Sequence, residues 1–287
     1  MISLILDTDL GDDVDDVFAL AYAVRNSRIN LCAVTTVLGD TRWRAALTLR
    51  LLDEMGVNDV PVAAGAPGGE VNTVTLSGDV VVPPGTDDPR CEACSATELM
   101  ADVIATAPEP VWLATIGPAT NAAVLLAERP EVLDGLAGIV MMGGRHEPAF
   151  PREHNFGTNP TAAAAVCNHG GTVRVGDYKV TCQAQLWRDD LPRVRQAPGV
   201  GVSLATMLET YFDRRERDWT SMYDPAALTL ALDQTFLTLD PSPMCADVVD
   251  SQVRFAPGAE TSGLQLANAI DVDAFHDELL SVINRPE

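Results

Sequence analysis

The residues best suited to chemistry are six aspartates that crowd between Asp7 and Asp16, directly after an apolar run. Ile2 to Leu6 has the length and apolarity of a buried strand, Gly11 permits a tight turn, and Val14 to Val24 reads as an apolar helix. The acids therefore follow the carboxyl end of a strand. Open α/β sheets bind their ligands at this position, in the crevice beyond the strand ends.

This density of aspartates favours a bound cation over simple helix capping. Aspartate at a helix start accepts free N–H groups and suits the positive end of the helix dipole, but this explains only a few of the six. So many like charges in ten residues are costly unless they are neutralised. Carboxylate oxygens are hard ligands, which points to Ca²⁺ or Mg²⁺. The alternative is a solvated acidic turn without a metal.

Two known acidic motifs can be compared with this stretch by counting. An EF-hand loop starting at Asp7 needs glycine sixth and an acid twelfth, but Gly11 is fifth and Phe18 is twelfth. A haloacid-dehalogenase-type phosphatase also opens with an apolar strand and a D-x-D pair. It needs a later phosphate-binding lysine, and the only lysine is Lys179, which follows a Gly-Asp pair. The EF-hand is excluded, whereas the phosphatase stays an alternative.

Composition limits the class of protein and of partner. The chain has 287 residues, 47% of them hydrophobic, and a net charge of -22, so we expect a single globular domain that binds neither nucleic acid nor an anionic membrane. No signal peptide is evident before Asp7, which predicts a cytoplasmic location. Of six cysteines only Cys91 and Cys94 have a paired spacing, and no matching second pair lies nearby, so we interpret them as ordinary thiols.

Apolar strand-like segments alternate with helical segments along the chain, which predicts an α/β fold. A Gly, Pro and Asp-rich loop is expected from Ala66 to Ser95, with a hairpin at Val71 to Val82. Expected strands are 30–37, 59–64, 111–116, 138–142 and 172–176, and a terminal strand pair is expected within 245–255. Expected helices are 42–55, 97–107, an alanine-rich segment after Pro160, 202–217 and 272–283. Asp40 caps the first of these helices or adds an acid to the site.

The segment DTDLGDDVDD, followed by Ala19-Leu20, resembles the opening motif of the inosine-uridine-preferring nucleoside hydrolase family, with two extra residues before the D-D pair. Later segments resemble the family in the same order. These are the turn 117–121, the M-G-G sequence that begins at Met142, the Glu153-x-Asn155 pair and the Asp224-Pro225 pair. The resemblance implies an open, mostly parallel central sheet flanked by helices, with the site at the carboxyl ends of the strands.

The resemblance also implies a calcium site. Matched to the family pattern, Asp9, Asp16 and Asp224 would hold Ca²⁺ together with the backbone carbonyl of Ile116. A carbonyl ligand is indifferent to its side chain, so isoleucine is acceptable there. Asp9 would also act as the general base that takes a proton from water.

Further residues are matched to substrate. Asp15, Glu153 and Asn155 would bind ribose hydroxyls, with Met142 beside the ribose and Asp224 facing both metal and sugar. An acid and an amide two apart on an extended segment would face the same side. Several positions depart from the family, and two of them are candidates for contact with the base: His154 replaces a phenylalanine, and Tyr223 replaces the usual histidine acid.

These departures concern the leaving base. Tyr223 would donate a proton to the base or stack on it, although a phenol is a weaker acid than an imidazole at neutral pH. His154, Trp219 and Tyr211 are further candidates for base contact. Family members that act on inosine or uridine have a histidine in the early loop, whereas this chain has none between Val62 and Met100.

The predicted function is calcium-dependent hydrolysis of the N-glycosidic bond of a ribonucleoside, whose base could be modified or unusual. The alternatives are the phosphatase above and a calcium-bound ribose- or nucleoside-binding protein with little turnover. The resemblance further implies a homo-oligomer, either a dimer or a tetramer. The only other partner expected is the small-molecule substrate.

Overall fold

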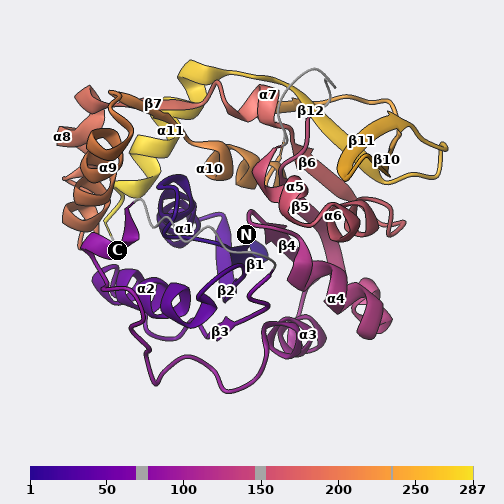
Figure 1. Cartoon of the computed structure of the whole chain (residues 1–287), viewed down its shortest axis with the longest axis horizontal. Coiled ribbons are helices and arrows are strands. Elements are labelled where there is room, and N and C mark those ends of the chain that lie inside the picture. The colour runs from indigo at the N-terminus through magenta and orange to yellow at the C-terminus, as the bar shows by residue number, and fades with distance from the viewer. Residues whose placement is uncertain (69–76, 146–152, 234, 287) are drawn as a thin grey trace.

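The computed structural model describes residues 1–68, 77–145, 153–233 and 235–286, and these residues form an α/β fold around one large sheet (Figure 1). The order of its strands is β11-β10-β12-β6-β5-β4-β1-β2-β3, and β9 pairs with β12. Neighbours are parallel from β3 across to β12, whereas β10 and β11 run antiparallel at one edge. The open, mostly parallel sheet expected from the sequence is confirmed.

The strands of this sheet are β1 (Ile2–Thr8), β2 (Ile29–Thr36), β3 (Val62–Ala64), β4 (Val111–Thr115), β5 (Leu136–Met142), β6 (Val173–Gly176), β9 (Leu237–Leu239), β10 (Met244–Val249), β11 (Gln252–Pro257) and β12 (Leu264–Ile270). Two short strands, β7 (Gln185–Trp187) and β8 (Trp219–Ser221), form a separate ribbon. The helices are α1 (Asp15–Arg25), α2 (Thr41–Glu54), α3 (Ala96–Thr106), α4 (Thr120–Glu128), α5 (His154–Thr158), α6 (Pro160–Cys167), α7 (Tyr178–Thr181), α8 (Leu191–Val194), α9 (Gly201–Arg215), α10 (Tyr223–Leu228) and α11 (Val272–Ile283). Among the described residues, none of these helices has both the length and the apolarity needed to cross a bilayer.

Strand β1 lies in the middle of the parallel region, between β2 and β4, and its apolar run is buried on both faces. Successive side chains of a strand point to opposite faces, so Leu4 and Leu6 join one hydrophobic cluster and Ile5 joins the other. Helices α1 and α10 lie on one side of the sheet, and α3, α4 and α6 lie on the other (Figure 1). Burial of β1 between these layers fixes the start of the acidic segment at the carboxyl edge of the sheet.

Most of the elements predicted from the sequence are present, with ends shifted by a few residues. The predicted strand pair within 245–255 is β10 with β11, but the sequence analysis did not identify β12, which lies between β10 and β6. The predicted hairpin is wrong for Gly78–Val80, which form a 3-10 helix, and its residues 71–76 lie outside the described part of the chain. Asp40 is exposed and accepts a hydrogen bond from the Trp43 amide at 3.0 Å, so it caps α2.

Candidate active site

The acidic turn after β1 depends on a glycine. Gly11 has φ = +114°, and a Cβ atom there would lie 2.6 Å from Cη2 of Trp43 on α2. Both the backbone conformation and the indole ring therefore exclude a side chain at this position. Across the turn, the Thr8 hydroxyl donates a hydrogen bond to a carboxylate oxygen of Asp16, and this bond joins the end of β1 to the start of α1.

The two acids that lengthen the motif are held by neighbouring helices. Asp12 forms an ion pair of 2.8 Å with Arg44 of α2, whose guanidinium also donates to the Leu10 carbonyl at 2.8 Å. Asp13 accepts hydrogen bonds from the Tyr211 hydroxyl of α9 at 2.9 Å and from the Val14 amide at 2.6 Å. These partners give Asp12 and Asp13, for which the sequence suggested no role, a place in anchoring the turn.

Three buried carboxylates converge at the carboxyl edge of the sheet. Asp15 and Asp16 lie in the first turn of α1 and Asp224 in that of α10, and each offers a carboxylate oxygen within 4.8 Å of the others. Burial, and then the neighbouring negative charges, raise the pKa of all three well above the ordinary carboxyl value. Hard oxygen donors in a buried, mutually repelling group fit a divalent cation such as Ca²⁺.

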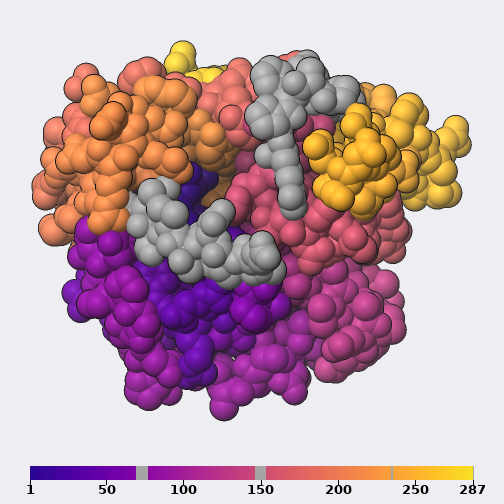
Figure 2. Space-filling model, viewed as in Figure 1, coloured from indigo at the N-terminus to yellow at the C-terminus, as the bar shows by residue number. Residues whose placement is uncertain are grey.

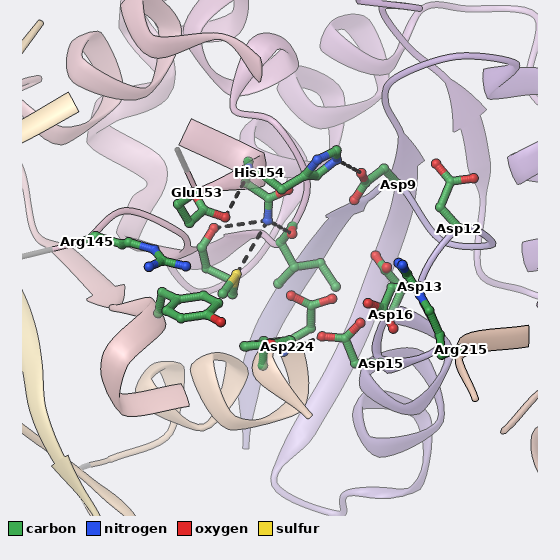
Figure 3. A pocket seen from close by; sticks show the side chains of 15 residues that line it. Asp9, Asp12, Asp13, Asp15, Asp16, Arg145, Glu153, His154, Arg215 and Asp224 are labelled. Atoms are coloured by element: carbon green, nitrogen blue, oxygen red, sulfur yellow. Dashed lines mark hydrogen bonds and ion pairs between the residues drawn. The ribbon is translucent and has the colours of Figure 1, made fainter. Parts of the chain in front are cut away.

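Asp9 lines the same cavity, beside this group (Figure 3). Its charge raises the pKa of both Asp16 and Asp224, although burial contributes more to each shift. The ligand set expected from the sequence contained Asp9 with Asp16 and Asp224, whereas the compact group has Asp15 in the place of Asp9. His154 faces Asp9, with 3.7 Å between Nε2 and Oδ2, and this carboxylate raises the pKa of the imidazole.

The Glu153 side chain is the N-cap of α5. Its carboxylate accepts hydrogen bonds from the amides of Gly144 at 3.0 Å, Asn155 at 2.9 Å and Phe156 at 2.9 Å, while burial raises its pKa. The expectation that Glu153 and Asn155 lie on an extended segment is wrong, because Asn155 is already helical. A helix cap holds the carboxylate in a fixed position on the wall of the cavity, which Glu153 lines.

Asn155 joins two strand ends. Its Nδ2 group donates to the carbonyl of Ile116, after β4, at 2.6 Å and to that of Met142, at the end of β5, at 3.2 Å. A carbonyl oxygen has two lone pairs, so Ile116 keeps one acceptor position for a cation.

The cavity of about 430 Å³ combines these groups with aromatic and cationic side chains. In the space-filling view a hollow opens between the orange α9 surface and the rose-coloured segments that follow β5, with N-terminal residues inside it (Figure 2). The lining residues are Asp9, Asp12, Asp13, Asp15, Asp16, Ile116, Met142, Arg145, Glu153, His154, Asn155, Tyr178, Arg215, Tyr223 and Asp224. Ten of the twelve candidate residues from the sequence analysis are in this set, and the other two, Tyr211 and Trp219, are not.

Comparison with known proteins agrees with this geometry. The sequence profile described as inosine-uridine preferring nucleoside hydrolase matches residues 4–277. The chain belongs to this family. It is 31% identical over 256 residues to the pyrimidine-specific ribonucleoside hydrolase RihA of Citrobacter koseri, covering 82% of this chain and 80% of that one. The corresponding Shewanella enzyme is 32% identical over 249 residues, with 80% and 77% covered.

Solved structures of nucleoside hydrolases have the same fold. The purine-preferring ribonucleoside hydrolase from Gardnerella vaginalis superposes with a TM-score of 0.84 at 25% identity, covering 98% of each chain. An inosine-guanosine nucleoside hydrolase has a TM-score of 0.84 at 20% identity over 100% of each chain, which supports the fold alone. Because the chain belongs to the nucleoside hydrolase family, it is an N-ribosyl hydrolase, and the phosphatase alternative is set aside.

Five residues that line the site were not candidates: Asp12 and Asp13, whose partners are described above, and Arg145, Tyr178 and Arg215. Arg145 follows the Gly-Gly pair after β5, and no spacing in the sequence marks it as functional. Tyr178 lies in a segment that only loosely follows the family. Arg215 lies within the predicted helix 202–217, and nothing in that segment of sequence indicated that its side chain would reach the cavity. Its position depends on how α9 packs against the acidic turn.

Of the three aromatic candidates for base contact, only Tyr223 is among the described residues that line the cavity. Tyr223 lines the cavity and stacks on Tyr178, with 5.5 Å between ring centroids, and burial raises its pKa above that of an ordinary phenol. Tyr211 is buried and bonded to Asp13, and Trp219 packs against Trp187 in the β7-β8 ribbon. Neither Tyr211 nor Trp219 lines the cavity formed by the described residues, so a base contact from either one is not supported.

Proposed function

We propose that this nucleoside hydrolase cleaves the N-glycosidic bond of a ribonucleoside with the help of a bound calcium ion. One observation carries the proposal: Asp15, Asp16 and Asp224, from opposite ends of the chain, form a buried carboxylate group next to Asp9. A metal-free group of this kind is strained by its own repulsion, whereas a divalent cation would neutralise it.

The ion would be held by carboxylates of Asp9, Asp16 and Asp224, by the Ile116 carbonyl, and by Asp15, which the structure adds to the group. When bound, calcium would orient two ribose hydroxyls and lower the pKa of a water molecule. Its preference for six to eight oxygen ligands at flexible angles suits a donor set that mixes carboxylate and carbonyl oxygens.

Asp9 is proposed as the general base. It would take one proton from the water that attacks C1′ of the ribose, while the bond between C1′ and the base nitrogen breaks and its electron pair leaves with the base. The His154 imidazole lies 3.7 Å from the Asp9 carboxylate, so it could restrain that side chain or contact the base.

The sugar would be held by Asp15, Glu153 and Asn155, with Met142 against its apolar face. Positive charge develops on the sugar ring as the base departs, as in other glycoside hydrolyses. Carboxylates fixed around the ring would stabilise that charge more strongly in the transition state than in the substrate.

Tyr223 is proposed to assist departure of the base. Because burial and the Tyr178 hydroxyl raise its pKa, the phenol stays protonated and is better suited to donating a hydrogen bond than to transferring its proton outright. It could also stack on the base, as its contact with the Tyr178 ring suggests.

The relatives do not agree on the base, since one is named for pyrimidines and another for purines. A modified or unusual base, a homo-oligomer and a cytoplasmic location also stay predictions.

The test is to incubate the purified protein with uridine, cytidine, inosine and adenosine and to measure free ribose, with calcium and after treatment with EDTA. We expect ribose release that chelation abolishes and calcium restores. Asp9→Asn should lower the rate by roughly 10²-fold or more, whereas the control Asp40→Asn, an exposed helix cap, should not.

Other outcomes would contradict the proposal. Binding of nucleosides without ribose release would favour the binding-protein alternative. Full activity after complete removal of divalent cations would refute the role assigned to calcium.

A further inference from the structure

Arg145 forms the outer layer of an aromatic stack on the cavity wall. Its guanidinium carbon lies 3.7 Å from the centroid of the Tyr178 ring, and that ring stacks on Tyr223 at an interplanar angle of 24°. The three residues come from separate elements: the segment after β5, the start of α7 and the start of α10. All three line the cavity that holds the carboxylate group.

This stacking restricts the directions in which the Arg145 guanidinium can donate hydrogen bonds. One face of its plane is in van der Waals contact with a ring, so hydrogen bonds must leave from the N–H groups at its rim. A guanidinium has five such donors and no acceptor, and it stays charged at any pH of interest. Arg145 therefore recognises acceptor atoms and repels donors.

The charge of the cavity decides what kind of acceptor can approach. Arg145 and Arg215 lie on opposite sides of Asp15 and Asp224 (Figure 3), and seven carboxylates line the same space. An anionic group such as a 5′-phosphate would be repelled by this set of acids. The carbonyl oxygen of a neutral base meets no such penalty and still attracts a cation.

We propose that Arg145 is a specificity-determining residue that donates hydrogen bonds to one carbonyl oxygen of the base, at the position where cytidine and adenosine carry an amino group. The inference rests on the proposed function. It assigns to this enzyme the nucleosides of oxo bases, such as uridine and inosine, in preference to their amino counterparts, cytidine and adenosine. An amino group in place of the carbonyl would direct N–H bonds at a guanidinium that cannot accept them.

The same contact assists bond cleavage. The electron pair of the broken C1′–N bond spreads from the base nitrogen onto the carbonyl oxygen, and the base later takes a proton from water. A hydrogen bond from a cation strengthens as this negative charge develops, so Arg145 would bind the transition state more tightly than the substrate. This role complements Tyr223, whose buried phenol is a weak acid.

The experiment compares kcat/KM for uridine with cytidine and for inosine with adenosine, in the calcium-loaded wild type, Arg145→Gln and Arg215→Gln. The wild type should prefer the oxo base of each pair. Loss of the charged donor in Arg145→Gln should reduce both ratios by roughly ten- to a hundredfold. Arg215→Gln removes the same charge from the opposite side of the cavity and should leave the ratios unchanged.

A second substrate separates a specific role from a structural one. The p-nitrophenolate ion departs readily without a hydrogen bond from the enzyme, so Arg145→Gln should retain most of its rate on p-nitrophenyl riboside. Equal losses on p-nitrophenyl riboside and on all nucleosides, or unchanged base ratios, would overturn the inference. A selective loss on nucleoside 5′-phosphates would also overturn it, by placing Arg145 at the other end of the sugar.

Failure of the proposed function would be recognised separately. If the wild type released ribose from no nucleoside, thermal shifts with uridine and cytidine would test the inference directly. Greater stabilisation by uridine that is lost in Arg145→Gln would support the base contact, and equal shifts would refute it.

Discussion

Replacement of Arg44 by methionine tests whether the acidic turn depends on one buried cation. The Arg44 side chain is only 3% exposed, against 25% for Asp12, its partner in the ion pair. Its guanidinium donates to the Leu38 carbonyl at 2.6 Å, to the Leu10 carbonyl at 2.8 Å and also to that of Asp9. Methionine fills similar space but leaves the carboxylate and three carbonyls without their donor.

The expected loss of stability follows from burial. Removing one partner of a buried ion pair costs about 3–5 kcal/mol, because the other charge stays where water is scarce. At about 2 °C for each kcal/mol in a chain of this size, the Tm should fall by roughly 6–10 °C. The control Arg42→Gln, on the same helix, breaks an exposed ion pair with Asp87 and should cost less than about 1 kcal/mol.

Activity should fall together with stability. Arg44 holds the backbone of Asp9, and a displacement of about 1 Å in a catalytic group can cost roughly 10²-fold in rate. The assay measures Tm by calorimetry and kcat/KM from ribose release well below the Tm. A double variant with Asp12→Asn should recover part of the lost stability. A loss of less than about 1 kcal/mol in the free energy of unfolding of the Arg44→Met variant would refute this reasoning, and so would a folded variant with unchanged kcat/KM.

Three further predictions follow from the site. Gly11→Ala should destabilise the protein by about 1–3 kcal/mol, since its Cβ would meet Trp43; an unchanged Tm would contradict this. Tyr223→Phe should slow nucleosides far more than p-nitrophenyl riboside, and equal losses would exclude a role at the base. Burial and then the Asp9 charge raise the pKa of Asp16 in the folded protein. Protonation of Asp16 therefore stabilises the folded state fully below the unfolded pKa of about 4, and this contribution is lost as the pH rises through the folded pKa. In EDTA, Asp16→Asn should therefore reduce the fall of Tm with pH, and parallel curves would contradict this.

The sequence by itself determined the local structure and the chemical type of the site. An apolar run that alternates between two buried faces predicts β1, and the acids after it lie at the carboxyl edge of the sheet as expected. The predicted helix 272–283 is α11 with the same ends. These features depend on residues a few positions apart, whose hydrogen bonds and side-chain periodicity are readable along the chain.

Only the tertiary structure decided which distant residues meet. The Asp224 amide lies 3.3 Å from a carboxylate oxygen of Asp15, 209 positions away, and Arg145 meets Tyr178 only because β5 and β6 are neighbours. Resemblance to a family could indicate that Asp224 lies near the acidic turn, whereas no feature of the sequence indicates that Arg145 contacts Tyr178. The order of strands and the packing of helices on the sheet arise from burial of the whole core, which a short window of sequence does not contain.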